Sequence, residues 1–389
     1  MELFQVETIA SHFKFRGRFA GAVRCDNGHI NDTYIVTTAL PGGGSRRYVL
    51  QRINHQVFRS PEDVMANIRR VTAHLRKKVI ERGGDPEREI VNLVPTVDGS
   101  DLYVTGNGEY WRAYLYVEGA RTYESVEEPK HFCGAGEAFG RFQSLLSDFP
   151  AETLVETIPH FHDTPARFAA LMEAVETDAC NRAKDVREEI AFAKSREADA
   201  SVVVNLLESG EIPLRVTHND TKLNNVLIDD VTGEGICVLD LDTVMPGSTL
   251  YDFGDAIRFG ASAAAEDERD LSKVRIDLEL YRQFTRGYLR AARDFLTKRE
   301  LELLPFSAKL LSYELGMRFL TDYLNGDVYF RIHRPGHNLD RARAQFRLAQ
   351  DIEENLDRML EIVAEEYERA PEDREPAKHA HERRLRASG

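Results

Sequence analysis

The spacing of apolar residues divides the chain into two parts. As far as residue 117, short apolar runs rich in branched and aromatic residues alternate with polar turns, which is typical of β-strands. From about residue 130 onward, apolar residues recur three and four positions apart, which is typical of amphipathic helices. The pattern predicts a bilobal α+β protein, with a small antiparallel sheet in the N-terminal lobe and a large, mostly helical C-terminal lobe.

Strands are expected within residues 18–36, 47–52 and 90–117, and a helix over residues 60–82 begins at a Ser-Pro-Glu-Asp signal. Longer helices are expected over residues 132–146, 167–178, 185–207, 274–295, 305–324 and 339–364. Residues 366–389 are charged and poor in apolar residues, so they predict a disordered tail.

One stretch of the helical part, residues 214–258, replaces helical spacing by short apolar runs and polar turns. A loop there enters a buried strand, and Asp240 follows the next strand, so Asp220, Asn225 and Asp240 can converge. Mg²⁺ prefers oxygen ligands of this kind and leaves its other positions to water and phosphate. A carboxylate that does not bind the metal can take the proton of an attacking hydroxyl group.

The spacing of these three residues is more informative than the residues themselves. After His218, Asp220 and Asn225 stand five positions apart, and Asp240 follows twenty positions after Asp220, which leaves room for one hairpin. Protein-kinase-like phosphoryl transfer uses an Asp and an Asn at this interval and a second Asp on the next strand. An acidic turn followed by a coincidental Asp would not explain the full pattern.

The runs HNDTKLNN (His218–Asn225) and VLDLD (Val238–Asp242) resemble the aminoglycoside phosphotransferase and choline kinase superfamily. With YDFGDAIR at residues 251–258, they are more similar still to the N-acetylhexosamine 1-kinases. These bacterial enzymes phosphorylate the anomeric hydroxyl of N-acetylglucosamine or N-acetylgalactosamine. The resemblance implies a protein-kinase-like fold, with a nucleotide-binding lobe at residues 1–117 and a catalytic, acceptor-binding lobe at residues 118–365.

The resemblance also implies a role for each polar residue of this stretch. Asp220 matches the catalytic base, and Asn225 and Asp240 match ligands of Mg²⁺, with ATP as the phosphoryl donor. Asp252 opens the triplet Asp-Phe-Gly, which spells the metal site of protein kinases, but it lies thirty-two positions after Asp220. In the superfamily an Asp at this place holds the catalytic loop, so we expect a structural role for Asp252.

The phosphates of the nucleotide are expected under the hairpin of residues 18–36, whose turn Asn27-Gly28 is a strong hairpin signal. In the superfamily this hairpin covers the phosphates with hydrogen-bond donors. The candidate donors here are Gly28, Asn31 and Thr33. An ordinary hairpin without a ligand is the alternative.

The strand at residues 47–52 departs from the superfamily, because Gln51 stands where a phosphate-binding Lys is usual. Either Gln51 donates a neutral hydrogen bond to the phosphates, or a bulge turns Arg52 toward them, since Arg52 otherwise faces the opposite side of the sheet. Tyr116 and Glu118 flank the point at which the lobes join and at which, by resemblance, adenine bonds to the backbone. An edge strand followed by a turn is the alternative there.

The acceptor is expected on the helical lobe. Arg318 and Tyr329 match an Arg and a Tyr that touch the sugar in the hexosamine kinases. We expect Thr243, just after the metal strand, to bind the sugar with them, and Asp220 to contact the reacting hydroxyl. Arg318 could equally be a surface charge of a helix. The run PHFHD at residues 159–163 invites a metal interpretation, but one such cluster is weak evidence for zinc, and a loop with Phe161 as an apolar wall of the acceptor site is preferred.

Composition narrows the choice of partners. The apolar content of 42% and the charged content of 30% are ordinary for a soluble globular protein. The net charge of −14 argues against nucleic acid and anionic membranes as partners, and no apolar run approaches a membrane span. The four cysteines lack metal-ligand spacing, which suits a reducing cytoplasm. We expect a cytoplasmic monomer or weak dimer that binds a small molecule.

These observations predict an ATP- and Mg²⁺-dependent kinase that converts a neutral amino sugar to its 1-phosphate. A kinase for another small alcohol, such as homoserine, choline or an aminoglycoside, stays open as an alternative, because the acceptor pocket is assembled from distant segments. A nucleotide-binding pseudokinase that acts as an interaction module is the third hypothesis. The intact trio Asp220, Asn225 and Asp240 argues against that hypothesis.

Overall fold

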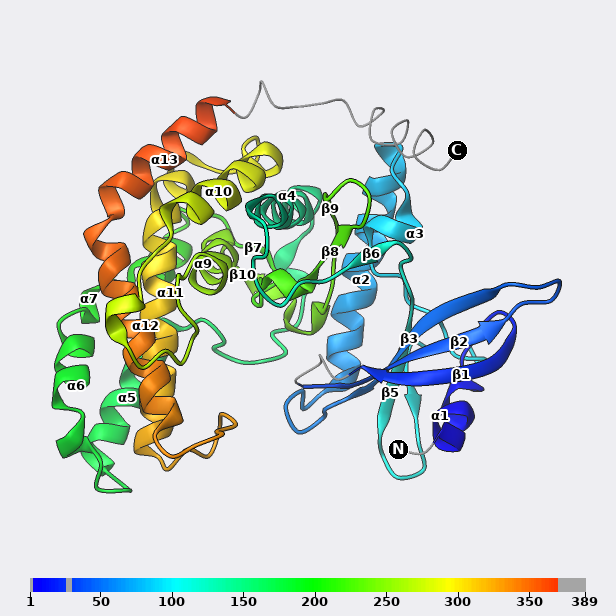
Figure 1. Ribbon diagram of the computed structural model, residues 1–389, viewed down its shortest axis with the longest axis horizontal. Helices are drawn as coiled ribbons and strands as arrows, with labels where there is room; N and C mark the ends of the chain where they lie inside the picture. Colours follow the sequence, from blue (N-terminus) through cyan, green and yellow to red (C-terminus); the bar gives the residue numbers. More distant parts are fainter. Residues whose placement is uncertain (1–2, 26–29, 370–389) are drawn as a thin grey trace.

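The structure is a computed structural model that describes residues 3–25 and 30–369. The predicted hairpin turn Asn27-Gly28 and residues 370–389 of the predicted tail lie outside these residues. Two lobes follow one another along the chain, a sheet lobe in blue and cyan and a helical lobe in green to red (Figure 1). The predicted α+β class, with a small antiparallel sheet in the N-terminal part and helices in the C-terminal part, is confirmed.

The N-terminal lobe is built on one antiparallel sheet with the strand order β1-β2-β3-β5-β4. Its strands are β1 (Arg18–Cys25), β2 (Asp32–Ala39), β3 (Ser45–Ile53), β4 (Tyr103–Val104) and β5 (Tyr110–Leu115). The helices of this lobe are α1 (Leu3–Ala10), α2 (Pro61–Glu81) and α3 (Pro86–Glu89). In Figure 1, α2 runs between the sheet and the helical lobe.

The two faces of this sheet differ because side chains alternate along each strand. One face forms a core of its own with residues of α1, and this core includes Tyr34, Leu50 and Trp111. The other face carries Gln51 and Arg112, which are direct partners in the β3–β5 register. Polar side chains of two strands are therefore brought together on the side of the sheet that faces α2 and the helical lobe.

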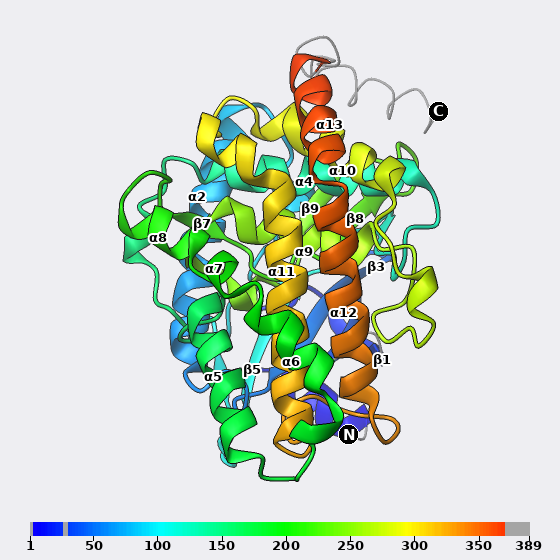
Figure 2. The same ribbon diagram turned by 90° about the vertical axis from the view of Figure 1, so that its left-hand side faces the viewer.

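The larger helices of the C-terminal lobe are α4 (Pro129–Leu145), α5 (Thr164–Thr177), α9 (Thr249–Gly260), α10 (Leu278–Ala292), α11 (Lys298–Leu324), α12 (His337–Glu354) and α13 (Leu356–Arg369). Figure 2 shows α11 and α12 side by side, and the two helices are in contact. Three short helices, α6 (Arg187–Lys194), α7 (Glu197–Ala200) and α8 (Val202–Glu208), replace the one predicted over residues 185–207. Across the described ranges, no helix combines the length and the apolar character that crossing a membrane requires.

Glycines allow α4 and α10 to pack closely. A Cβ atom at Gly287 of α10 would lie 1.9 Å from the carbonyl oxygen of Cys133, and one at Gly136 of α4 would lie 2.3 Å from that of Phe284. Neither position can carry a side chain unless the helices separate, because protein interiors have no space to absorb such a contact. This packing fixes α4, which supports the site described below.

Two small sheets interrupt the helices in the stretch that was predicted to carry the chemistry. β7 (Arg215–Thr217) pairs with β10 (Met245–Gly247). β8 (Val226–Asp229) lies between β6 (Ala120–Arg121) and β9 (Gly235–Val238). The loop of residues 218–225 therefore joins β7 to β8, and Asp240 follows β9, as the sequence predicted.

The predicted start of α11 at Pro305 is wrong. The helix begins after Thr297, whose side chain forms a capping box with Glu300, and Pro305 lies inside it. Proline lacks the amide hydrogen that a helix interior uses, so it is a poor residue there and a plausible start from sequence. The capping box offers a stronger start signal, and the helix keeps Pro305 in its third turn.

Candidate active site

Asp252 of α9 fixes the loop between β7 and β8 through its backbone. Its carboxylate, in a residue that is 2% exposed, accepts from the amides of His218 at 2.9 Å and Asn219 at 2.7 Å. Gln143 of α4 donates a third hydrogen bond at 2.7 Å. These bonds occupy both carboxylate oxygens, so Asp252 holds the catalytic loop, as expected.

His218 links this loop to the strand that leads to Asp240. Its Nδ1 accepts the amide hydrogen of Asp220 at 3.2 Å, and its Nε2 lies 2.7 Å from the carbonyl oxygen of Leu239. When Nδ1 accepts this hydrogen, the proton on Nε2 is donated to the Leu239 carbonyl oxygen. Two phenylalanines of α4 pack edge-on against the ring. The loop and the strand are thereby held at a fixed separation.

The loop presents Asp220 as a partly exposed carboxylate. Lys222 Nζ lies 2.7 Å from its Oδ1, and Asn225 Nδ2 lies 3.2 Å from its Oδ2. Burial lowers the pKa of Lys222, but the carboxylates of Asp220 and Asp255 outweigh it and leave the pKa raised, so the ammonium stays charged. Sequence reasoning missed Lys222, although a Lys two positions after the candidate base was a visible signal.

Asn225 and Asp240 fit a divalent cation. Asn225 Nδ2 donates to Asp220, so the other end of the amide, Oδ1, is the end that can accept a cation. Asp240 is open to solvent on one side, yet the protein around its carboxyl group and the nearby Asp242 and Asp220 carboxylates raise its pKa to about 7. A cation beside these carboxylates would relieve their repulsion.

The protein alone offers too few ligands for a metal ion. Within residues 3–25 and 30–369, no three His, Cys, Asp or Glu side chains are grouped so that they could hold one. Water and phosphate oxygens would have to complete the coordination, an arrangement that is usual for Mg²⁺ at phosphate-binding sites. The alternative of a metal at residues 159–163 finds no support in this arrangement.

Asn31, Thr33 and Gln51 belong to one hydrogen-bonded network. Gln51 Nε2 donates to Thr33 Oγ1 at 3.0 Å, and Gln51 Oε1 accepts from Arg112 Nε at 3.0 Å. Asn31 Nδ2 donates to Asp242 Oδ2 at 2.7 Å. Both ends of the Gln51 amide are thus engaged within the protein, and its contact with phosphate stays a prediction.

Arg52 faces away from this network. Its guanidinium pairs with Asp32 and Glu109, and the pairing of β3 with both neighbouring strands runs without a bulge. The predicted alternative in which a bulge turns Arg52 inward is therefore wrong, because the regular pleat sends adjacent residues to opposite faces. The inward cation is Arg112, which sequence reasoning missed although an Arg inside the strand YWRAYL was a visible signal.

Tyr116 and Glu118 lie at the predicted exit from the sheet lobe. The Tyr116 amide donates to the carbonyl oxygen of Arg47 at 3.3 Å, and the Arg47 guanidinium lies 4.0 Å from the centroid of the Tyr116 ring. Arg47 Nε also donates to the Glu118 carboxylate at 3.0 Å, and the Glu118 carbonyl oxygen accepts from Arg88. These bonds engage the Tyr116 amide and the Glu118 carbonyl, so adenine recognition by this segment stays a prediction.

Arg318 of α11 lies between two aromatic rings. Its guanidinium carbon is 5.6 Å from the ring centroids of both Phe161 and Phe330. In the part of the chain that the structure describes, this guanidinium has no ion pair or hydrogen bond, although Arg318 is only partly exposed. The Tyr329 ring packs edge-on against Phe330, and the residue is 70% exposed. Arg318 and Tyr329, which were predicted to bind the acceptor, are therefore near one another, with Phe161 as an apolar wall.

His162, next to Phe161, connects this region to the catalytic loop. Its Nδ1 lies 2.8 Å from Glu314 Oε1, its ring centroid lies 4.9 Å from that of Tyr251 of α9 with the rings tilted by 31°, and its buried Nε2 has no partner among residues 3–25 and 30–369. Asp255 lies one turn after Tyr251 on α9 and accepts from the amide of Thr221 at 3.0 Å. A continuous set of contacts thus runs from the loop at residues 159–163 to the loop that carries Asp220.

Thr243 is placed differently from Arg318 and Tyr329. Its hydroxyl donates to the carbonyl oxygen of His218 at 2.6 Å, and its own carbonyl accepts from Asn219 Nδ2 at 2.8 Å. The donor of this buried side chain is therefore engaged in holding the catalytic loop. A contact between Thr243 and a sugar stays a prediction.

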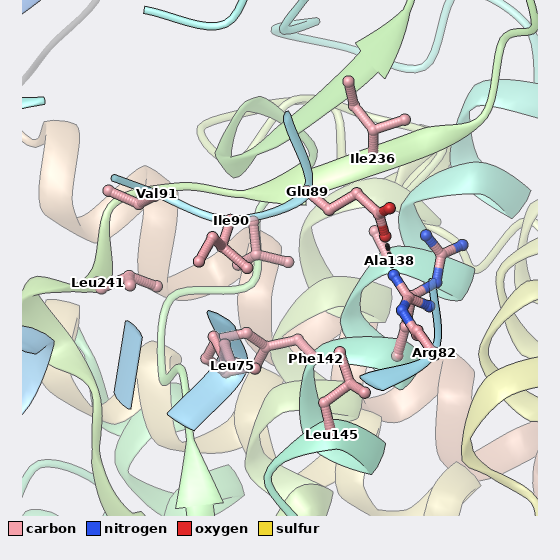
Figure 3. A pocket seen from close by; sticks show the side chains of 12 residues that line it. Leu75, Arg82, Glu89, Ile90, Val91, Ala138, Phe142, Leu145, Ile236 and Leu241 are labelled. Carbon is pink, nitrogen blue, oxygen red and sulfur yellow. Dashed lines mark ion pairs between the residues drawn. The ribbon is translucent and has the colours of Figure 1, made fainter. Parts of the chain in front are cut away.

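A pocket lies behind the strand that leads to Asp240, between the end of α2, residues 89–91, α4 and β9 (Figure 3). Its walls are mainly aliphatic, and an ion pair between Arg82 and Glu89 stands at one side. Burial and the neighbouring Arg141 lower the pKa of Arg82 to about 10. None of the residues predicted to bind nucleotide, metal or acceptor lines this pocket, so it is separate from the site built around Asp220.

Solved structures share this two-lobed architecture at low sequence identity. A microcompartment-associated aminopropanol kinase is 16% identical with a TM-score of 0.56, over 92% of this chain and 98% of that chain. A choline kinase from Cryptosporidium parvum Iowa II is 12% identical with a TM-score of 0.56, over 93% and 98%. An amicoumacin kinase in complex with AMP-PNP, Ca²⁺ and Ami is 13% identical with a TM-score of 0.56, over 91% and 94%.

At these identities the structural likeness shows the fold alone, which is the protein-kinase-like fold of the aminoglycoside phosphotransferases and choline kinases. Membership is shown by sequence, because the model of the phosphotransferase enzyme family matches residues 21–297, most of the chain. That match includes the loop of Asp220, the strand before Asp240 and the network of Arg112. The protein belongs to the phosphotransferase enzyme family.

Proposed function

We propose that the protein is an ATP- and Mg²⁺-dependent kinase that phosphorylates the anomeric hydroxyl of N-acetylglucosamine or N-acetylgalactosamine. The observation that carries the kinase activity is the setting of Asp220. It is a partly exposed carboxylate on a loop whose backbone Asp252 fixes, with Lys222 at one of its oxygens. The family of the chain supports the reaction class. The solved amicoumacin kinase, which holds AMP-PNP and Ca²⁺, supports a nucleotide with a divalent cation.

In the proposed reaction, Asp220 accepts the proton of the acceptor hydroxyl. The hydroxyl oxygen forms a bond to the γ-phosphorus of ATP, and the bond from this phosphorus to the bridging oxygen breaks, which releases ADP. Asn225 and Asp240 would hold Mg²⁺, which when bound neutralises charge on the phosphates. Lys222 orients the base from its Oδ1 side, while Asn225 bonds to the Oδ2 side.

The surroundings of Arg318 favour a neutral acceptor over a cationic one. The guanidinium is held between Phe161 and Phe330 and has no ion-pair partner in the described ranges, so its hydrogen-bond donors are free for a ligand. The neighbouring Arg167 is partly buried, and burial and the charge of Arg318 lower its pKa. Two guanidinium groups so close together would repel a protonated amine or a quaternary ammonium group.

Hydroxyl and acetamido oxygens are the groups that suit these donors. Arg318 can donate to a carbonyl or ring hydroxyl oxygen, and the exposed ring of Tyr329 can cover the apolar face of a sugar. Choline and aminopropanol, named for two of the structural neighbours, carry a positive charge at neutral pH and lack such oxygens beyond one hydroxyl. This contrast supports the proposal of a neutral amino sugar as acceptor.

The experiment that tests the proposal is product analysis. Purified protein is incubated with ATP, Mg²⁺ and either free sugars, including both N-acetylhexosamines, or cationic and amino acid acceptors, including choline, aminopropanol, homoserine and an aminoglycoside. Phosphorus NMR of the products then identifies the phosphorylated position. We expect a sugar 1-phosphate from an N-acetylhexosamine. Turnover confined to the second group would overturn the sugar assignment, and no turnover with any acceptor would favour the pseudokinase hypothesis.

A further inference from the structure

A buried ion pair joins the two lobes next to the metal-binding strand. Arg112 of β5 pairs with Asp242, which follows Asp240 by two positions, through two hydrogen bonds that use both carboxylate oxygens. Arg112 is 1% exposed and Asp242 is 3% exposed. The pair therefore connects the sheet of the N-terminal lobe to the short turn between β9 and β10 in the C-terminal lobe.

The remaining polar atoms around this pair are also satisfied. Gln51 accepts from Arg112 Nε at 3.0 Å, and Asn31 donates to Asp242 Oδ2 at 2.7 Å. Asn31 Oδ1 in turn accepts from the amide of Asn54 at 3.0 Å. Gln51 of β3 thus holds the guanidinium, and Asn31, just before β2, holds the carboxylate. These bonds fix the orientation of the ion pair.

Stability alone is a poor reason for this arrangement. Two charges lose their hydration when they are buried, and well-packed apolar residues in their place are often as stable. The position of the pair offers a better reason. Asp240 has a φ of 53°, a left-handed conformation that is uncommon for a residue other than glycine, so the turn needs an anchor to hold it. Asp242, two positions after Asp240, supplies that anchor through its bonds to Arg112 and Asn31.

We propose that Arg112 and Asp242 are positioning residues that hold the turn of Asp240 for binding of Mg²⁺ together with nucleotide, and that they do so by fastening it to the N-terminal sheet. Arg112 is too buried to touch a nucleotide, so it acts through Asp242. Gln51, at the place where a phosphate-binding Lys was expected, orients the guanidinium. The inference rests on the proposed nucleotide and metal site and is independent of which alcohol is phosphorylated.

The test uses three variants of the full chain: Arg112→Gln, Asp242→Asn and the double variant. Dissociation constants for ATP are measured by calorimetry without acceptor, with Mg²⁺ and with a chelator, and melting temperatures are recorded in parallel. Each single variant should melt lower, because it leaves a buried charge unpaired. Each should also bind ATP with Mg²⁺ roughly 10–100-fold more weakly, as expected for residues that orient a metal ligand. Binding without Mg²⁺ should change less than about twofold.

The double variant separates positioning from stability. It leaves no unpaired charge, so its melting temperature should recover toward that of the wild type, while its affinity for ATP with Mg²⁺ should stay weak. Recovery of both quantities, or wild-type affinity in a destabilised single variant, would overturn the inference. If the single variants do not fold, the double variant decides by the same criterion.

Glu366→Gln is the matched control, because this buried carboxylate pairs with Arg282 and Arg286 between α10 and α13 and has no bond to the Arg112 network among the described residues. It should lower the melting temperature and leave nucleotide affinity unchanged. If the control weakens nucleotide binding as much as the single variants do, the effect is one of general stability and the inference fails. Wild-type protein that binds no ATP with Mg²⁺ would instead reject the proposed function itself.

Discussion

The loop of Asp220 and the turn of Asp240 are neighbours in space but are anchored in different ways. The backbone amides of the loop of Asp220 are held from the helical lobe, by Asp252 and Asp255 of α9. The turn of Asp240 is held from both lobes, because Asp242 bonds to Arg112 and Asn31 of the sheet lobe. The direct anchors of the proposed base therefore lie in the helical lobe, whereas the turn of the proposed metal ligand also has anchors in the sheet lobe.

This difference separates two steps of the proposed reaction, deprotonation of the acceptor and binding of the nucleotide, by the lobes that hold their residues. In the proposed reaction, deprotonation of the acceptor needs Asp220, whose loop has its direct anchors in the helical lobe. Binding of the nucleotide with its metal needs the turn of Asp240, which is also fastened to the sheet lobe through Asp242. Substitutions in the two regions should accordingly separate turnover from nucleotide binding.

The largest effect is expected from Asp220→Asn. The amide keeps the size of the side chain and can accept from its neighbours, but it cannot take a proton, and general-base catalysis is worth roughly 10²–10⁴ in rate. Steady-state kinetics with the sugar identified by product analysis should show this loss in kcat. Calorimetry should show unchanged binding of ATP with Mg²⁺, and near-normal turnover of a folded variant would remove Asp220 from the role of base.

Asp240→Ala and Asp252→Ala sharpen the contrast between the two aspartates. Loss of a metal ligand removes several kcal/mol of favourable interaction with the phosphates, so Asp240→Ala should weaken ATP binding with Mg²⁺ by about 100-fold or more. Asp252→Ala leaves two buried backbone amides without an acceptor and should cost about 1–3 kcal/mol per group in folding stability. Paired calorimetry and thermal melting distinguish the two outcomes, and the reverse pattern would exchange the assigned roles.

Arg318→Ala should separate the acceptor from the nucleotide. A hydrogen bond from a charged donor is worth about 1.5–3 kcal/mol, so the KM for the sugar should rise by roughly 10–100-fold. The KM for ATP should stay within about twofold, because Arg318 belongs to the loop and helix region around Phe161 and Phe330. Arg299→Ala, on an exposed turn of the same helix α11, is a matched control and should change neither constant. Equal changes in both constants for Arg318→Ala would indicate a structural role.

The smallest effect concerns the pH dependence of stability in the helical lobe. Glu300 of α11 accepts from Arg215 of β7 and from Thr249 of α9, and although burial alone would raise its pKa, these bonds and the capping bond with Thr297 lower it below 4.5. A lowered pKa means that the stabilisation is present above about pH 4.5 and is lost as the pH falls through the lowered value.

Glu300→Gln should therefore lower the free energy of unfolding by about 2 kcal/mol at pH 7. The difference between variant and wild type, measured by urea unfolding, should shrink below pH 4.5. A difference that does not depend on pH would mean that the charge of Glu300 does not contribute. Arg215 and Thr249 flank the catalytic loop and its α9 anchor. As the pH falls below 4.5, turnover should therefore decrease before the sheet lobe loses stability.

The sequence predicted the parts of the site that lie on local patterns. The interval from Asp220 to Asn225 and the strand before Asp240 could be recognised because each depends on neighbouring positions. The role of Asp252 in holding the loop was implied by the resemblance to the superfamily. For these residues, the spacing along the sequence was enough to predict where they lie in the structure.

The parts that could not be predicted depend on pairs that are distant in sequence. Arg112 and Asp242 are 130 positions apart, and no pattern within a short stretch of sequence indicates that they are in contact. The pairing of Gln51 with Arg112 across β3 and β5 could not be identified without the strand register. Pro305 was taken for a helix start because its local preference is strong, while the capping box at Thr297 and the packing of α11 determine where the helix begins.

The contacts of Arg318 with the rings of Phe161 and Phe330 have a consequence for the evolution of acceptor specificity. Phe161 and Phe330 belong to loops outside the regular elements, whereas the loop of Asp220 and the turn of Asp240 are anchored by α9 and by the pair of Arg112 and Asp242. Libraries that randomise only the two loops should therefore yield variants with new acceptors while phosphoryl transfer is kept. Under the proposed function, directed evolution can therefore vary the segments that contact the acceptor while the segments of Asp220 and Asp240 stay unchanged.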